Sequence, residues 1–272
     1  MKVALVCCGR LENRYAEEFI EHYNQLGVDH IFIIDNNYDG EEHFEDVLQS
    51  YIDEGLITIL DYRNKERIQI IAFKEIYDQY ENEYDYMMFF DFDEFLILKN
   101  YNSIKDYLKN NKDFDVICIN WRIYTDNDLL YYDNRKCIER FNVPTDESYN
   151  LNFFVKSIIK TGLKNINWTY THIPHTNYNI NELRYCDNKF DEIIFDSIFH
   201  MESYYDESEA YIKHFMTKTV EEFISKLKRG GGTTFKETIN KFRIDEFFNI
   251  NKRTKEKENI LNNYLESLWQ DL

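Results

Sequence analysis

A short apolar run that ends in acidic residues constrains the fold of this chain more than any other feature. The run covers Tyr86–Phe90, and Asp91, Asp93 and Glu94 follow it at once. An apolar run of this kind is typical of a strand that is buried on both faces of a parallel sheet. Ligands bind at the carboxyl ends of strands in open α/β sheets, so we expect these acids at a binding edge.

Acidic side chains at the end of a buried strand need a counter-charge. Carboxylates repel each other and lose hydration when they are buried, and a bound cation offsets both effects. Oxygen ligands at alternate positions suit a hard divalent ion, Mn2+ or Mg2+, which commonly binds phosphates as well. We therefore predict a metal-assisted site for a diphosphate at Asp91 and Asp93. A solvated acidic pair is the alternative, because the chain has 50 acidic residues.

Strand and helix patterns alternate along the first half of the chain. Apolar runs at 3–6, 30–34 and 56–60 predict strands, and the apolar stripes between them predict amphipathic helices. This alternation favours a parallel sheet with right-handed crossover connections. We expect an α/β fold with a mainly parallel, Rossmann-type sheet that is flanked by helices.

The pattern becomes less regular after a strand predicted at 116–120. Residues 122–150 are polar and rich in Tyr, Asp and Asn, which indicates a long loop. Two further strands are predicted at 152–159 and 210–215. The second half of the chain is therefore expected to add strands to the sheet and to carry a loop that serves the site.

The C-terminal part of the chain is predicted to be helical. Thr219 and Glu222 form a capping-box pattern for a helix that glycines at 230–232 end. Two polar amphipathic helices are predicted around 235–248 and 254–270. We divide the chain accordingly into an α/β domain, 1–232, and a C-terminal helical appendage, 233–272.

The appendage concentrates basic residues, with acidic residues interleaved among them. Ion pairs on helix surfaces explain this pattern. We therefore expect the appendage to pack against the domain or to support a homodimer. A peripheral contact with an anionic membrane surface is the alternative.

Composition and cysteine spacing exclude several classes of protein. The formal net charge of −18 argues against a nucleic-acid partner, because phosphate backbones are bound by an excess of Lys and Arg. The five cysteines show no CxxC spacing, which favours buried thiols in a reducing compartment. The N-terminal run is too short for a signal peptide or a membrane span. We expect a cytoplasmic protein without a transmembrane segment.

Short motifs are spread over residues 3–230: Arg10-Leu-Glu12, Tyr15-Ala-Glu-Glu-Phe19, Leu26-Gly-Val-Asp-His30, Asp35-Asn-Asn37, Asp91-Phe-Asp-Glu-Phe95, Asn120-Trp-Arg122, Glu139-Arg-Phe141, Ile212–Thr219 and Glu221-Glu-Phe223. These segments resemble the motifs of one family of enzymes, the glycosyltransferase 2-like group related to glycosyltransferase family 92, which has the GT-A fold. The fifth of these resembles the Asp-x-Asp metal motif of the family. The order and spacing of the segments, taken together, are specific.

The resemblance implies a metal-dependent glycosyltransferase of GT-A-like fold. It would move a sugar from a nucleotide-sugar donor, UDP-linked, to a hydroxyl of a glycan or glycolipid with inversion, in polysaccharide or oligosaccharide synthesis. We expect Mn2+ (or Mg2+) on Asp91, Asp93 and His214. The donor contacts that we expect are Arg10, Asp35, Arg67, Asp91 and Lys218. Turn or surface roles are the alternatives for Asp35 and for the two arginines.

The irregular stretch from Trp121 to His175 is expected to form the acceptor side. Indole and phenol faces pack against the C–H faces of sugars, which suggests Trp121, Tyr124 and Trp168, with core packing as the alternative for each. Inverting transfer needs a base that deprotonates the acceptor hydroxyl. Asp126 and His172 are candidates for this base, and the sequence does not separate them from Asp128 and His175, which are also in the segment.

Two other functions fit parts of the pattern. A nucleotidyltransferase can share the sheet and the acidic metal site, but it should carry a Gly-rich loop after the first strand, and Cys8-Gly-Arg10 has one glycine. A module that binds a nucleotide or a sugar without catalysis would use the acids for structure.

Overall fold

The computed structural model describes residues 1–176, 182–195, 204–230 and 244–270. The chain divides into two compact units: unit 1, Met1–Arg122 with Glu147–His214, and unit 2, Ile123–Asp146 with Phe215–Leu272. The domain boundary predicted at residue 232 lies outside the described residues, so that division stays a prediction. No helix in the described ranges is long and apolar enough to cross a membrane.

Unit 1 is built on a mixed sheet. Its strands are β1 (Val3–Gly9), β2 (His30–Asp35), β3 (Ile57–Asp61), β4 (Tyr86–Phe89), β5 (Glu94–Leu98), β6 (Val116–Ile123), β7 (Val155–Lys160), β10 (Tyr185–Cys186), β11 (Glu192–Ile193) and β12 (Ala210–His214). Their spatial order is β11-β10-β6-β7-β4-β1-β2-β3, and β12 pairs with β5 and β6. Two short strands, β8 (Ile166–Trp168) and β9 (Pro174–Thr176), form a separate antiparallel pair.

The strands that carry the predicted site run parallel. β1 pairs in parallel with β2 and with β4, and β2 pairs in parallel with β3. Gly9 lies opposite Asp35, and Asp35 lies opposite Asp61, so these strand ends meet at one edge. β7 is antiparallel to both β4 and β6. The predicted α/β class is confirmed, and the strand predicted at 152–159 begins later, at Val155, because a 3-10 turn occupies Asn150–Phe153.

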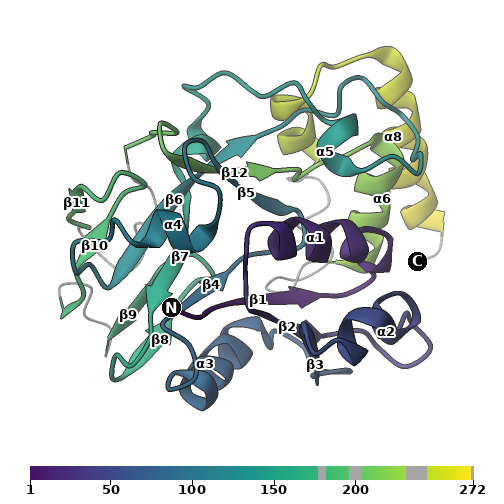
Figure 1. Ribbon diagram of the computed structural model, residues 1–272. Helices are drawn as coiled ribbons and strands as arrows, with labels where there is room; N and C mark the ends of the chain where they lie inside the picture. Colours follow the sequence, from purple (N-terminus) through teal and green to yellow (C-terminus); the bar gives the residue numbers. More distant parts are fainter. Residues whose placement is uncertain (177–181, 196–203, 231–243, 271–272) are drawn as a thin grey trace. The chain divides into compact units, whose positions relative to one another are not determined.

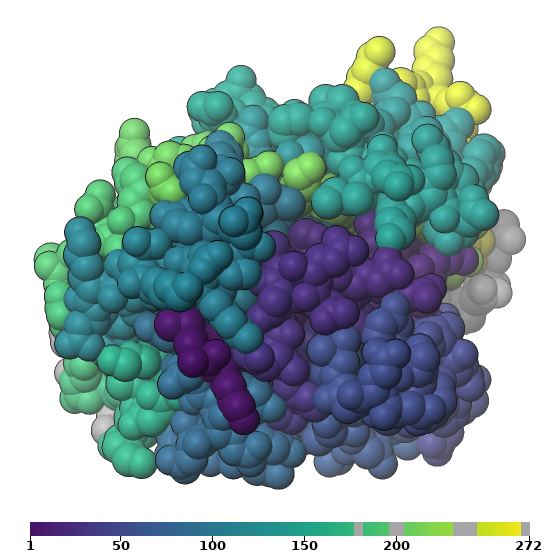
Figure 2. Space-filling view, in the orientation of Figure 1, coloured from purple at the N-terminus to yellow at the C-terminus, as the bar shows by residue number. Residues whose placement is uncertain are grey.

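The helices of unit 1 cover both faces of the sheet. They are α1 (Asn13–Gln25), α2 (Glu45–Asp53), α3 (Gln69–Tyr80) and α4 (Ile104–Leu108). Figure 1 shows α1 and α3 on opposite sides of the strands of unit 1. α2 lies at the surface in Figure 2, in agreement with its single buried residue, Leu48.

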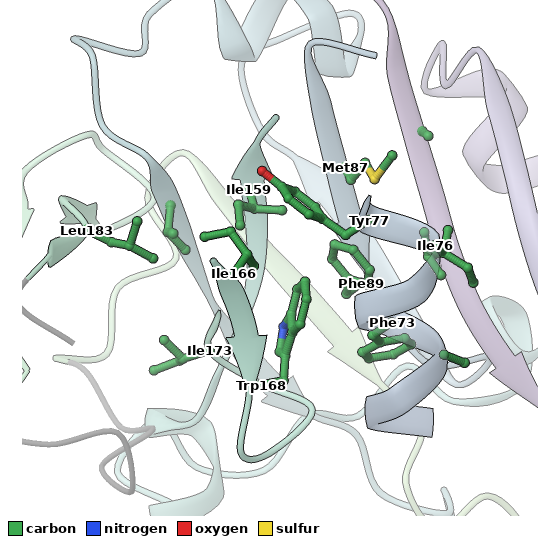
Figure 3. Close-up of a cluster of buried hydrophobic side chains, with 14 of the residues drawn as sticks. Phe73, Ile76, Tyr77, Met87, Phe89, Ile159, Ile166, Trp168, Ile173 and Leu183 are labelled. Carbon is green, nitrogen blue, oxygen red and sulfur yellow. The ribbon is translucent and has the colours of Figure 1, made fainter. Parts of the chain in front are cut away.

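A hydrophobic cluster fills the space between the sheet and α3. Phe89 from β4 packs against Phe73 at 4.9 Å and against Trp168 at 4.8 Å between ring centroids, and Tyr77 joins them (Figure 3). Alternate residues of β1, β2 and β4 point into this cluster, as the period of two along a strand requires. The cluster holds the strands whose ends form the site.

Helix α1 supports the chain just beyond β4. Its buried stripe is Tyr15, Ala16, Phe19, Ile20 and Tyr23, the spacing of one helical face. Phe19 lies 4.8 Å from Phe92 between ring centroids, and the Tyr23 hydroxyl donates to the Glu94 carbonyl at 2.7 Å. The turn that carries the acids is therefore packed against α1.

Unit 2 has a small core of its own. Its helices are α5 (Cys137–Arg140), α6 (Val220–Arg229) and α8 (Lys255–Gln270), and residues 244–250 are also helical. Val220, Phe223 and Leu227 of α6 pack with Phe247 and Leu261. The helix predicted at 254–270 is confirmed by α8, whereas 235–243 of the other predicted helix lies outside the described residues.

The capping box predicted for α6 is confirmed. The Thr219 hydroxyl accepts from the Glu222 backbone N–H, and the Glu222 carboxylate accepts from the Thr219 N–H. Gly230 follows the helix with φ of 80°, a conformation that glycine adopts without strain. Both oxygens of Glu222 also accept from Arg140, at 2.7 and 2.9 Å, and both side chains are 1% exposed. This bidentate pair ties the 123–146 segment to α6.

Replacement of Arg140 by Leu is expected to destabilise the protein by about 3–5 kcal/mol, because Glu222 would keep a buried charge without its partner. Urea unfolding would measure the loss. The double variant Arg140→Leu with Glu222→Leu should recover most of it. The matched control is Arg135→Leu, whose pair with Asp133 is exposed and should contribute little. Equal losses in the two single variants would contradict this account.

Candidate functional site

The three acids predicted at a strand end lie in one turn between β4 and β5, Asp91–Glu94, which we call the acid turn. The turn continues the β4 pairing, since the Phe90 N–H donates to the Val6 carbonyl at 3.2 Å. The Asp91 N–H then donates to Glu94 Oε2 at 3.0 Å and closes the turn. Asp93 and Glu94 are buried, and Asp91 is half-buried.

A buried lysine neutralises part of the acid turn. Lys156 on β7 is fully buried, and its Nζ lies 2.7 Å from Asp91 Oδ2 and 3.5 Å from Glu94 Oε2. Gln69, at the start of α3, donates to the other Asp91 oxygen at 2.7 Å. The sequence analysis missed Lys156, although a lysine within the apolar run 153–159 was the signal that could have found it.

The charges in this group set the protonation of its members. Burial raises the pKa of Glu94 well above its ordinary value, and the neighbouring Asp91 and Asp93 add to the rise. Burial also acts to raise the pKa of Asp91, but the Lys156 ammonium brings it below its ordinary value. For Lys156, burial acts to lower the pKa, and Asp91 and Glu94 together raise it. Lys156 thus lies beside two carboxyl groups whose pKa values move in opposite directions, downward for Asp91 and upward for Glu94.

The other predicted metal ligands meet across the pairing of β5 and β12. Glu94 lies opposite His214 in the strand register, which brings His214 Nε2 to 3.5 Å from Asp93 Oδ1. Among the described residues, no group of three His, Cys, Asp or Glu side chains is arranged to hold a metal ion. Asp93 and His214 are thus brought together as predicted, while the Asp91 carboxylate faces Lys156 and Gln69.

Asp35 lies at the same edge, at the end of β2, and is almost fully buried. Its Oδ1 accepts from the backbone N–H and the side-chain amide of Asn37, at 3.0 and 2.7 Å. Its Oδ2 accepts from Arg63 Nη1 at 2.8 Å. Arg63 also donates to the carbonyls of Tyr38 and Glu42, so it locks the loop after β2. The sequence analysis did not single out Arg63.

Gly9 allows the close packing at this edge. A Cβ at Gly9 would lie 2.7 Å from ring atoms of both Phe44 and Phe92. Any other residue would therefore push Phe92, and with it the acid turn, out of place.

The two predicted donor arginines differ in their surroundings. Arg10 forms a bidentate pair with Glu41, at 2.9 and 2.7 Å, and its guanidinium lies 4.1 Å from the centre of the Tyr38 ring. Arg67 is exposed and has a positive φ of 55° just before α3. Arg10 is thus held near the loop that follows Asp35, whereas Arg67 is presented to solvent.

Four rings form an aromatic cluster beside the acid turn: Trp121, Phe154, His172 and His214. The Trp121 ring lies 4.4 Å from the His214 ring, 5.0 Å from the His172 ring and 5.8 Å from the Phe154 ring. Trp121 Nε1 is buried and has no hydrogen-bond partner in the described part of the chain. The His172 Nδ1 lies 2.9 Å from the Val155 carbonyl and must donate to it, which leaves Nε2 as the acceptor.

Trp168 occupies a different place. It is 5% exposed and packs between Phe73, Tyr77 and Phe89 in the core of unit 1 (Figure 3). Core packing was the alternative for this residue, and we leave Trp168 out of the site.

Three predicted site residues belong to unit 2. Tyr124 packs on Phe215 with 5.6 Å between ring centroids. Asp126 is 1% exposed and lies 2.7 Å from Lys257 Nζ. Burial raises the pKa of Asp126 while Lys257 opposes the rise, so this carboxylate already has a buried counter-charge. Lys218 is buried and has a positive φ of 54° just before α6.

The comparison with protein families decides the class of this protein. The model of Glycosyltransferase family 92 matches residues 6–252, most of the chain. The chain belongs to glycosyltransferase family 92. The predicted family resemblance is therefore confirmed, and the sheet and helices of unit 1 agree with the predicted α/β class.

The similar solved structures share little sequence identity with this chain. S. aureus TarS 1-349 in complex with UDP-GlcNAc is 12% identical over 97% of this chain and 72% of that chain, with a TM-score of 0.44. GalNAc-T7 with UDP, GalNAc and Mn2+ is 14% identical over 82% of this chain and 47% of that chain, with a TM-score of 0.41. A further structure of S. aureus TarS 1-349 is 13% identical over 59% of this chain, with a TM-score of 0.37, and the match spans about half of that protein, 47%. A search of curated proteins found no match.

His172 of this family 92 glycosyltransferase should make the fold sensitive to acid. Burial and the nearby Lys156 lower the pKa of His172 from 6.5 to about 4. The unfolded chain therefore takes up a proton first, so stability that is present above the unfolded pKa is lost as pH falls toward the folded pKa. Between about pH 7.5 and about pH 5 the loss from this group should be about 2 kcal/mol.

Urea unfolding at the two pH values would measure this loss. His172→Asn, which keeps an N–H for the Val155 carbonyl, should lose about 2 kcal/mol less than the wild type over the same interval. His43→Asn is the matched control, because His43 is exposed, and it should behave like the wild type. Identical pH profiles for wild type and His172→Asn would contradict the prediction.

Proposed function

We propose that this family 92 glycosyltransferase transfers a sugar from a UDP-linked donor to a hydroxyl of a glycan or glycolipid with the help of a divalent cation. The observation that carries the proposal is the approach of Asp93 Oδ1 to His214 Nε2, at 3.5 Å, beside two further carboxylates at the carboxyl edge of the sheet. This edge is where α/β sheets bind nucleotides. The family supports the class of reaction.

The residues at this edge fit a divalent cation. A carboxylate and an imidazole are a mixed oxygen and nitrogen set, which suits Mn2+ better than Mg2+. Asp93 and His214 would hold the ion, and Asp91 would bind the donor beside it. When bound, the ion supplies Lewis-acid stabilisation of the negative charge that develops on the departing diphosphate. Lys218 and the N-terminus of α6 are proposed as further contacts for phosphate.

Asp35 is proposed to recognise the nucleoside of the donor. Arg63 and Asn37 hold the Asp35 carboxylate in one orientation. Its oxygens are therefore positioned as hydrogen-bond acceptors before the donor binds, and binding does not have to order this side chain. Arg10 is proposed to contact the donor near Asp35, because its guanidinium lies over the ring of Tyr38 in the loop after β2. Arg67 is exposed and is proposed as a contact that forms with the donor.

The aromatic cluster is proposed as part of the acceptor side, with Trp121 as the sugar contact and its Nε1 as an available donor. Tyr124, in unit 2, is proposed as a further acceptor contact. For the general base of an inverting transfer we propose His172 rather than Asp126. The Nε2 of His172 is an unprotonated acceptor, whereas the Asp126 carboxylate is paired with Lys257. We further propose that the protein is cytoplasmic and acts in polysaccharide or oligosaccharide synthesis. Its C-terminal helices are proposed to serve packing or dimerisation.

Metal-dependent binding of UDP tests the proposal. Asp93→Asn and His214→Ala should each weaken UDP binding in Mn2+ by about tenfold or more, because each removes a ligand of the ion. Calorimetric titration with Mn2+ and with chelator would measure the effect. Asp46→Asn, at an exposed acid of α2, is the matched control and should bind like the wild type.

Three results would count against the proposal. UDP affinity that depends on Mn2+ equally in Asp93→Asn and wild type would remove the metal assignment. Release of pyrophosphate from a nucleoside triphosphate would favour a nucleotidyltransferase. UDP-sugar binding without any turnover across a panel of glycan and glycolipid acceptors would favour a binding module.

Trp121→Phe tests the acceptor side. The variant keeps a ring against His172 and His214 but removes the indole N–H, so turnover with acceptor should fall by about tenfold, the loss of one hydrogen bond of about 1.4 kcal/mol. Hydrolysis of the UDP-sugar donor, followed by release of UDP, should change little. An equal fall in both rates would indicate a folding defect.

A further inference from the structure

The carboxylates of the acid turn face two different partners. Asp91 and Glu94 face the ammonium of Lys156, at 2.7 and 3.5 Å, while Asp93 faces His214 at 3.5 Å. Gln69 fixes the second oxygen of Asp91 at 2.7 Å. Glu94 Oε1 is buried and has no hydrogen-bond partner in the described ranges, so Lys156 is its nearby compensating charge.

The position of Lys156 is strongly determined. It lies on β7 between Val155 and Ser157, and all three side chains are fully buried. An ammonium in such a place has lost its hydration, which is tolerated only when charged or polar groups surround it. The pairing of β7 with β4 aims this strand end at the acid turn, because Met88 lies opposite Ile158.

We propose that Lys156 is a positioning residue of the donor site: a built-in cation that compensates Asp91 and Glu94, so that a single divalent ion is held on the Asp93–His214 side and the donor diphosphate meets a less negative surface. This inference rests on the proposed function. It adds to that function a second cation that the protein itself supplies.

Loss of the Lys156 charge should have two opposite effects. The acid turn would become more negative, and Asp91 would be available to an ion, so free Mn2+ should bind more tightly. UDP carries negative charge, so its binding at saturating Mn2+ should weaken. A variant that is merely damaged would lose both affinities, so the opposite signs identify the charge effect.

Lys156→Met removes the charge at similar length, and Lys156→Arg keeps it. Calorimetry would titrate Mn2+ alone, and then UDP at saturating Mn2+. For Lys156→Met we expect Mn2+ to bind about tenfold more tightly and UDP to bind about tenfold more weakly. This is the size of the effect of one unit charge that acts through a partly screened part of the protein. Lys156→Arg should restore both affinities to within about threefold of the wild type.

Lys160→Met is the matched control. Lys160 lies on the same strand, and its partner Asp113 is exposed. This variant should bind Mn2+ and UDP like the wild type. If Lys156→Met does not fold, the double variant Lys156→Met with Glu94→Gln leaves Asp91 as the one carboxyl group that has lost Lys156 as its partner, and it should fold and still bind UDP more weakly than Glu94→Gln alone.

The outcomes separate this inference from the function on which it rests. Wild-type protein that binds Mn2+ and UDP, with a folded Lys156→Met variant that shows unchanged affinities or a loss of both, would overturn the role of Lys156 alone. Equal UDP affinities in the double variant and in Glu94→Gln would do the same. Wild-type protein that binds no UDP under either condition would overturn the proposed function, and the inference with it.

Discussion

Buried carboxylates raise the free energy of a fold unless positive charge is placed beside them, and the pairing of Lys156 with Asp91 meets this constraint in unit 1. β4 is buried on both faces and ends at Phe89, so the acid turn that follows it cannot move into solvent without disrupting the core around Phe89. β7 runs antiparallel beside β4, and this pairing places Lys156 beside the turn.

The approach of His214 to Asp93 depends on long-range strand pairing. β12 pairs with β5 in a register that puts His214 opposite Glu94, and a shift of one residue would turn the imidazole to the other face. Trp121 then packs on that imidazole at 4.4 Å and links it to His172. His214 of the proposed metal site and Trp121 of the proposed acceptor side therefore lie on two strands that pair in unit 1, β12 and β6.

Local patterns predicted some features well. The buried strand just before Asp91, the buried face of α1 and the capping box at Thr219 depend on residues that are near each other in the sequence. Lys156 and Arg63 were missed because each acts on a carboxylate far away in the chain, and a lysine or arginine alone carries no mark of its partner. Trp168 shows the reverse: its ring type suits a sugar, but its place in the core excludes it from the site.

By itself the sequence determined the α/β class, the family and the identity of the acids, because period, spacing and ordered motifs are local properties of the chain. Only the tertiary structure decided what each acid faces. Asp91 faces Lys156, Asp93 faces His214 and Asp126 faces Lys257. The physical reason is that a carboxylate that binds a metal and a carboxylate that forms a structural ion pair are the same chemical group in the sequence. Only the charge that folding places beside each carboxylate separates the two roles.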